Sequence, residues 1–170
     1  VYNPDGGTPW LLGPPSSATA PSLPNVWSSN LGGEAMDIAE KYLISPAIYL
    51  TNGNSAKLTF KHSYDFSDLT GFDLEYGVVE LIVDNSNTQV DLGSYMDMSL
   101  GWEEAEFDLT PYMGKIVYVV WYYLIFTMDS GPRPGWMIDD VSVTVQTVPT
   151  GRIELTNNLI NYLLYKRPVK

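Results

Sequence analysis

The sequence predicts an all-β fold in which two antiparallel sheets pack as a sandwich. Short segments that alternate apolar and polar side chains recur from Pro24 onward, separated by Gly, Asn, Asp and Pro turn signals. Up to residue 148, no segment between them has the 3.6-residue period of an amphipathic helix. The 170 residues include 5 Trp, 12 Tyr and 5 Phe, which is ample for one packed core.

The first predicted unit, residues 1–24, is an irregular segment draped on the domain. It holds six of the twelve prolines together with Gly6, Gly7 and Gly13, and such a composition does not sustain a strand. We expect three apolar residues to pin it to the core: Trp10, Leu11 and Leu12.

The sandwich itself is predicted over residues 25–148. Its expected strands are Asn25–Ser29, Lys41–Leu50, Ala56–Tyr64, Glu75–Asp84, Trp102–Leu109, Lys115–Met128 and Trp136–Val148. Pro46 indicates an edge or a bend in the second of these. The longest apolar run, residues 116–127, contains five aromatic residues and is too short to span a membrane, so it predicts a central buried strand.

The alternation assigns faces to these strands. In the third strand, one face is expected to carry Leu58, Phe60, His62 and Tyr64. In the last strand, one face is expected to carry Met137, Asp139, Val141, Val143 and Val145, and the other Asp140, Ser142, Thr144 and Gln146.

Residues 149–170 form a separate tail. Residues 1–150 carry a net charge of −14, whereas residues 151–170 carry +3. Thr156 is a candidate N-cap, and Leu159, Tyr162, Leu163 and Lys166 follow helical spacing. The tail is therefore expected to be a short helix or a linker that leads into a further domain.

Charge and residue counts exclude several classes of function. With 9 Lys and Arg against 20 Asp and Glu, the chain lacks the basic footprint of a nucleic-acid binder, and anionic membranes would repel it. It has no cysteine and one histidine, which excludes disulfides, thiol catalysis and zinc sites built from several His or Cys ligands.

Asp139 is the strongest candidate for a metal ligand. It lies among apolar residues in the last strand, where a carboxylate needs a partner, and a structural Ca²⁺ with six to eight oxygen ligands would supply one. Nearby loops offer further oxygen donors, namely Asn30, Glu34, Asp37, Asp73 and Glu75. The alternative is that Asp139 accepts loop N–H groups without a metal.

Other candidates have simpler structural explanations. His62, between Phe60 and Tyr64, is interpreted as a core histidine, because no nucleophile-elbow motif accompanies it. Glu103, Glu104 and Glu106 are interpreted as a solvated strand face, although a glycosidase pair would use such residues. An aromatic platform for sugars would draw on Trp102, Trp121, Tyr122, Tyr123 and Trp136. Tyr122 and Tyr123 are consecutive, so they must face opposite sides of a strand.

The order of these segments resembles a family of extracellular jelly-roll domains. Residues 42–50 (YLISPAIYL) are similar to the family's "YL-SPAIDLS", and residues 58–65 (LTFKHSYD) to "LSFWHWYD". Residues 135–143 (GWMIDDVSV) are similar to its closing "GWYIDDVSV". These are MAM-like domains of the immune inhibitor A type, found appended to secreted bacterial and archaeal peptidases.

The resemblance implies a jelly-roll module without catalytic residues and often with bound calcium. It places Asp139 and Asp140 at the family's acidic pair. The family's Asp-Gly-Gly before the fourth strand is replaced here by Phe72-Asp73-Leu74-Glu75-Tyr76-Gly77. The predicted calcium ligands are thus Asp139, Asp140, Glu75, Asp73, Asn30 and Asp37.

The sequence therefore predicts an accessory module of a larger secreted or cell-surface protein, stabilised by calcium. Its expected partners are neighbouring domains of the parent chain and a glycan or protein ligand, with no nucleic acid and no membrane insertion. One alternative is a carbohydrate-binding module, for which Tyr122, Tyr123 and Trp102 are the stacking candidates. A second alternative is a hydrolase fragment.

Overall fold

The computed structural model describes residues 9–15, 18–33, 38–66, 75–84, 88–126 and 132–147. Within these residues lie ten strands and one 3₁₀ helix. They are β1 (Leu11–Gly13), β2 (Val26–Ser28), β3 (Ala39–Ile44), β4 (Ile48–Tyr49), β5 (Ser55–Asp65), β6 (Glu75–Val83), β7 (Thr88–Tyr95), β8 (Glu103–Asp108), η1 (Thr110–Tyr112), β9 (Ile116–Ile125) and β10 (Gly135–Gln146).

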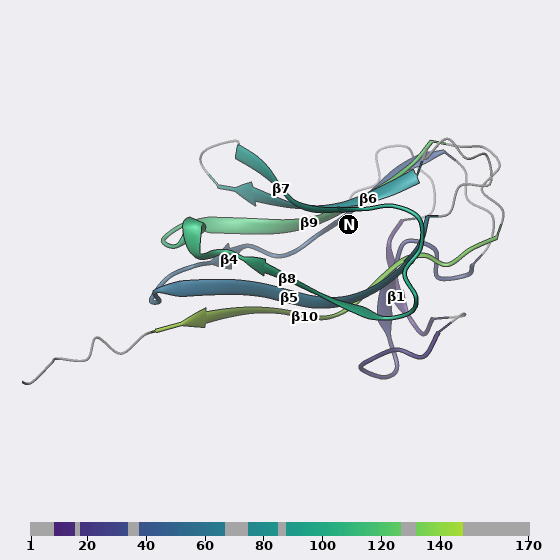
Figure 1. Ribbon diagram of the computed structural model, residues 1–170, viewed down its shortest axis with the longest axis horizontal. Helices are drawn as coiled ribbons and strands as arrows, with labels where there is room; N and C mark the ends of the chain where they lie inside the picture. The colour runs from purple at the N-terminus through teal and green to yellow at the C-terminus, as the bar shows by residue number, and fades with distance from the viewer. Residues whose placement is uncertain are drawn as a thin grey trace, which may run out of the picture.

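The strands form two antiparallel sheets that pack face to face, which confirms the predicted sandwich (Figure 1). One sheet, here called the β10 sheet, has the order β1-β2-β10-β5-β8. The other, the β9 sheet, has the order β3-β9-β6-β7, with β4 also paired to β9. In the part of the chain that the structure describes, no helix has the length and apolarity needed to cross a membrane.

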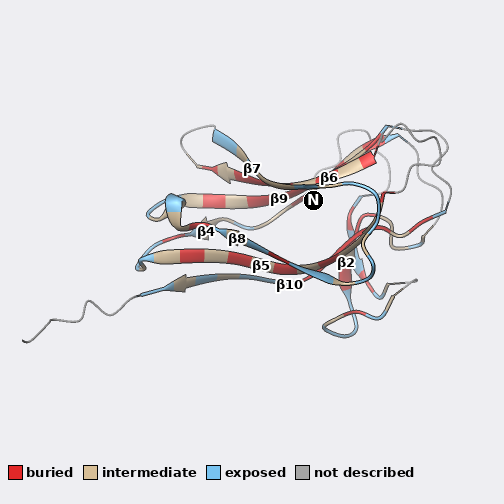
Figure 2. Ribbon diagram, in the orientation of Figure 1, coloured by how far each residue is buried: buried red, intermediate tan, exposed pale blue. Residues whose placement is uncertain are grey.

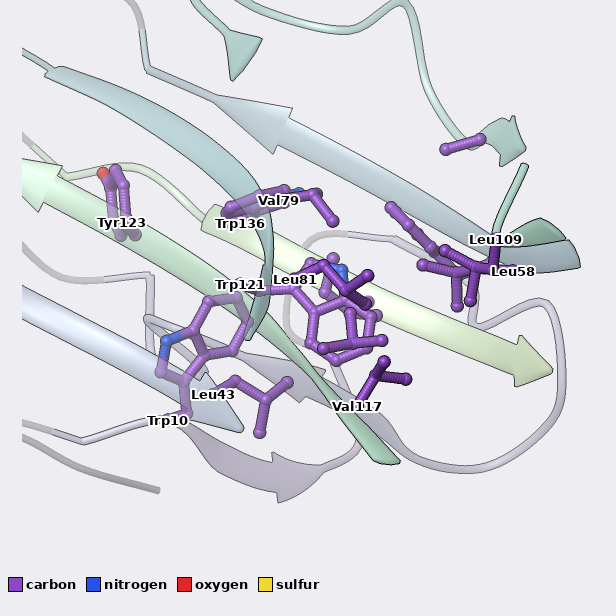
Figure 3. Close-up of a cluster of buried hydrophobic side chains, with 14 of the residues drawn as sticks. Trp10, Leu43, Leu58, Val79, Leu81, Leu109, Val117, Trp121, Tyr123 and Trp136 are labelled. Atoms are coloured by element: carbon purple, nitrogen blue, oxygen red, sulfur yellow. The ribbon is translucent and has the colours of Figure 1, made fainter. Parts of the chain in front are cut away.

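The core fills the space between the sheets because the strands alternate as the sequence predicts. Buried positions recur along β5, β6 and β9 at every second residue or nearly so (Figure 2). Leu58, Phe60 and His62 point inward from β5, and Val79, Leu81 and Val83 point inward from β6. Trp136, Trp121 and Trp10 belong to the same cluster (Figure 3).

The N-terminal segment is less irregular than predicted. Trp10 is buried in the core, as expected, but Leu11 and Leu12 are exposed and form β1 with Gly13 at the edge of the β10 sheet. Strand β7 was not predicted, because its sequence TQVDLGSY mixes Asp, Gly and Gln into the run and gives a weak strand signal. Pro46 separates β3 from β4, as the predicted bend requires.

The face assignment of the last strand is wrong beyond Asp139. The pairing of β10 with β5 shifts between Asp139 and Ser142, where Asp140 adopts a φ of 50°. Because of this bulge, Trp136 and Ile138 point into the core before it, and Val143 and Val145 pack against the core after it. Asp139 therefore does not share a face with Val143 and Val145, and Val141 is exposed. The predicted tail helix lies outside the described residues.

Candidate functional site

The carboxylate of Asp139 is satisfied by donors of the chain itself. The Ser22 N–H and the Ser22 hydroxyl each donate to one of its oxygens at 2.8 Å, and the Asp140 N–H donates at 2.8 Å. Asp140 forms an ion pair with Lys61, with an N···O distance of 3.0 Å. The hydrogen bond with Lys61 lowers the pKa of Asp140. Asp139 thus ties the N-terminal segment to the bulge of β10.

Glu75 lies in a buried cluster at the start of β6. Arg133 forms an ion pair with it, and the Tyr123 hydroxyl donates to it at 3.0 Å. Lys41 is buried beside this cluster, and its Nζ donates to the Ser29 carbonyl at 2.8 Å. Burial lowers the pKa of Lys41 to about 8, an effect that the negative charge of Glu75 opposes. The cluster joins three strands of the β9 sheet to the segments that follow β2 and precede β10, around one buried carboxylate.

Three of the predicted calcium ligands, Asn30, Glu75 and Asp139, each have partners in the chain itself. Asn30 donates through Nδ2 to the Arg133 carbonyl at 2.7 Å, and Glu75 is already neutralised by a guanidinium, whereas Asp139 lies on the other sheet. Among the described residues, no group of three or more His, Cys, Asp or Glu side chains is placed to hold a metal. Asp37 and Asp73 lie outside these residues, so calcium stays a prediction.

The consecutive tyrosines of β9 face opposite ways, as their spacing requires. Tyr123 is fully buried beside Glu75, and burial holds the pKa of its hydroxyl well above the usual range. Tyr122 points outward and stacks on Tyr42 of β3, with ring centroids 4.8 Å apart and an angle of 26°. Tyr76 of β6 meets Tyr122 edge-on at 6.3 Å. Three strands therefore contribute one aromatic surface.

This surface, which we call the tyrosine face, is the outward side of the β9 sheet. The strand register orders it in rows that run across the sheet. The rows are Glu40, Leu124 and Tyr76; then Tyr42, Tyr122, Val78 and Ser94; then Ile44, Val120, Glu80 and Asp91; then Tyr118, Ile82 and Gln89. Aromatic and aliphatic side chains make up most of it.

Carboxylates stand on both sides of the tyrosine stack. The Tyr42 hydroxyl donates to Glu40 at 3.1 Å, and burial together with this contact raises the pKa of Tyr42 to about 12. Glu80 is only 8% exposed, although it lies on the outward side. Burial raises its pKa, with a further increase from the charge of Asp91 and an opposing hydrogen bond with Gln89.

Of the predicted stacking residues, only Tyr122 belongs to this surface. The indole N–H of Trp102 donates to the Thr19 carbonyl at 2.9 Å, and the ring packs against Ala20, Val26 and Met137. Trp102 thus covers the N-terminal segment. The sequence reasoning missed Tyr42, Tyr76, Glu40 and Glu80 as members of the face, because only the register of β3 and β6 against β9 brings them beside Tyr122.

His62 and the glutamates of β8 do not form a catalytic group in the described structure. His62 is 2% exposed, and its Nδ1 accepts a hydrogen bond from the Trp136 indole at 3.3 Å. Burial lowers the pKa of His62 to about 4, so the ring is neutral near pH 7. Glu106 pairs with Lys57 on the solvated side of β8 at 2.9 Å.

Comparison with known proteins places the chain in the context of a peptidase. It is 30% identical over 134 residues to Bacillopeptidase F of Bacillus subtilis (strain 168). The match covers 78% of this chain but only 9% of that protein. No family model matches the sequence. The chain is therefore similar to one small part of a much longer peptidase.

Proposed function

We propose that this chain is a non-catalytic accessory module of a larger extracellular protein that also carries a peptidase domain. The observation that supports the proposal is the match to 9% of a peptidase, a share that corresponds to one added domain. The buried, neutral His62 agrees with this role, because a general base needs access to its substrate.

The catalytic alternative is tested with the 170-residue chain itself. We expect no hydrolysis of casein, of fluorogenic peptides or of aryl glycosides above the buffer blank. Hydrolysis that disappears in a folded His62→Gln variant would contradict the accessory role. In the parent protein, deletion of residues 25–148 is expected to leave the cleavage of short peptides unchanged and to weaken the attachment of the protein to its substrate or surface.

We further propose that the module binds a glycan through the tyrosine face. The stack of Tyr42 on Tyr122, with Tyr76 edge-on beside it, is the observation that favours this function. Stacked, partly exposed rings offer flat apolar surface to the C–H side of a sugar ring, and the flanking carboxylates offer acceptors to its hydroxyl groups. Neighbouring rings from three strands suit a chain of sugar units.

A glycan array followed by titration calorimetry tests this function. We expect binding that Tyr122→Ala weakens by about tenfold or more, because the central ring of the stack is lost. Tyr49→Ala is the matched control, since Tyr49 is an exposed tyrosine of β4 that pairs with Ile116, about 20 Å along β9 from Tyr122. Equal losses in both variants, or silence on the array, would contradict the proposal.

A further inference from the structure

The described strands that form the tyrosine face place acidic side chains on it and no basic one. Strands β3, β4, β6, β7 and β9 contain a single basic residue, Lys41, and its side chain is buried on the inward side. The face carries Glu40, Glu80 and Asp91. Since residues 1–150 also carry a net charge of −14, the field around the face favours a cation.

Glu80 and its neighbour Asp91 place negative charge at one defined point of the tyrosine face. Glu80 is directly opposite Asp91 on β7, and Val120 separates it from Ile44 in the same row. The next row holds the Tyr42–Tyr122 stack, about 7 Å along the strands. Glu80 is 8% exposed and lies beside a second carboxylate. Its hydrogen bond with Gln89 offsets only part of the free-energy cost of removing its charge from water. A cation seated over this row would interact with both carboxylates at once.

We propose that the ligand of the tyrosine face is a glycan with free amino groups, that is, a polymer of 2-amino sugars. This inference rests on the proposed function and specifies its ligand. The sugar rings stack on Tyr42 and Tyr122, and an ammonium group at C2 reaches the Glu80–Asp91 pair. Tyrosine rings also attract a cation through their π faces, so the stack and the carboxylates favour the same ligand. Anionic glycans are repelled by the same charges.

Three matched tetrasaccharides test the inference by titration calorimetry. The β-1,4-linked tetramers of glucosamine, N-acetylglucosamine and glucose share one backbone and differ only at C2. We expect the glucosamine tetramer to bind about tenfold tighter than the other two, because it alone makes charge-assisted hydrogen bonds. This preference is expected to shrink when NaCl rises from about 0.05 M to about 0.5 M, since salt screens exposed charges.

Two kinds of variant separate charge from stacking. Glu80→Gln and Asp91→Asn are expected to abolish the preference for the glucosamine tetramer, so that each variant binds it no more tightly than it binds the glucose tetramer. Asp91 is exposed, so its replacement carries little risk for folding. Tyr122→Ala is expected to weaken all three ligands alike. Glu106→Gln, which removes a carboxylate from the other sheet, is the control and is expected to change nothing.

The outcomes distinguish the inference from the proposed function. Equal binding of the three tetramers would overturn the amino-sugar assignment and leave the glycan-binding face intact. Binding of none would overturn both. If tetralysine bound as tightly as the glucosamine tetramer, with the same loss in Tyr122→Ala, the partner would be a basic polypeptide and the amino-sugar assignment would be wrong.

Discussion

The outward faces of the two sheets differ in how their charged side chains are paired. On the β10 sheet, each lysine has an acidic partner on a neighbouring strand: Lys57 with Glu106 at 2.9 Å, and Lys61 with Asp140 at 3.0 Å. Thr144 and Gln146 lie near the first of these pairs, around a polar hollow of about 270 Å³. On the tyrosine face, Glu80 and Asp91 lie among rings and aliphatic side chains, and the one lysine in the strands of this sheet, Lys41, is buried on the inward side.

We infer from this difference that the outward face of the β10 sheet is hydrated, whereas the outward face of the β9 sheet binds a partner. Exposed pairs on the β10 sheet gain little energy, but they give both of its lysines an acidic partner. The β9 sheet buries Glu80 instead, at a cost that a cationic ligand would offset. Glu80 is therefore expected to affect both stability and binding, whereas the buried groups of the core are expected to affect stability.

The largest expected effect comes from the buried ion pair inside the β9 sheet. Arg133→Met leaves the Glu75 carboxylate buried without its guanidinium, and we expect the free energy of unfolding to fall by about 3–5 kcal/mol. Urea denaturation measures this loss. The double variant Arg133→Met/Glu75→Gln is expected to recover part of it, and a loss below about 1 kcal/mol would show that the pair is not buried as described.

The second effect concerns His62, inside the β10 sheet. Its pKa in the folded state is about 4, against 6.5 for an unperturbed histidine, so the unfolded chain binds the proton more readily. Its contribution to stability is present above about pH 6.5 and is lost as the pH falls toward 4, by about 3 kcal/mol in total. Urea titrations at a series of pH values measure this slope. A His62→Gln variant with an unchanged slope would contradict the assignment.

Glu80 is expected to change the free energy of unfolding with pH in the direction opposite to His62, and by a smaller amount. Its pKa is raised, so its contribution is greatest below the usual Glu pKa and is lost as the pH rises through the folded value. Glu80→Gln is therefore expected to raise the unfolding free energy at pH 7, by less than about 1 kcal/mol. The measurement is the midpoint of chemical denaturation at pH 4 and pH 7. A destabilised variant at pH 7 would mean that the chain already neutralises this carboxylate.

The smallest effect is expected on the β10 sheet's outward face. Lys57→Ala removes an exposed ion pair whose side chains are 43% and 58% accessible, and we expect a change of about 0.5 kcal/mol or less. Thermal denaturation at low and high salt measures it. A salt-dependent loss of stability several times larger than this would contradict the weak contribution that we expect from the exposed pair.

The sequence predicted the layers better than it predicted the surface. Period-two alternation placed Leu58 and Phe60 inside, and it required Tyr122 and Tyr123 to face opposite sides of their strand. It did not place the bulge between Asp139 and Ser142, which reverses the strand's faces, because no residue type there requires an extra residue.

The members of the tyrosine face could not be predicted from the sequence, for a related reason. Tyr42 and Tyr76 are 34 residues apart in the sequence, and both meet Tyr122 only through the register of three strands. The partner of Glu75 is similarly non-local, because Arg133 approaches it from the segment before β10. Local patterns determine which face a residue occupies, whereas pairing between distant strands determines its neighbours.

The central claim is that the outward face of the β9 sheet, and not that of the β10 sheet, is the binding surface. Amide chemical shifts of the ¹⁵N-labelled chain, followed during titration with the glucosamine tetramer, test it most directly. We expect shifts concentrated at residues 40–44, 76–82, 89–94 and 118–124, with β5 and β8 unaffected. Shifts that cluster on β5, β8 and β10, or no shifts at saturating ligand, would contradict it.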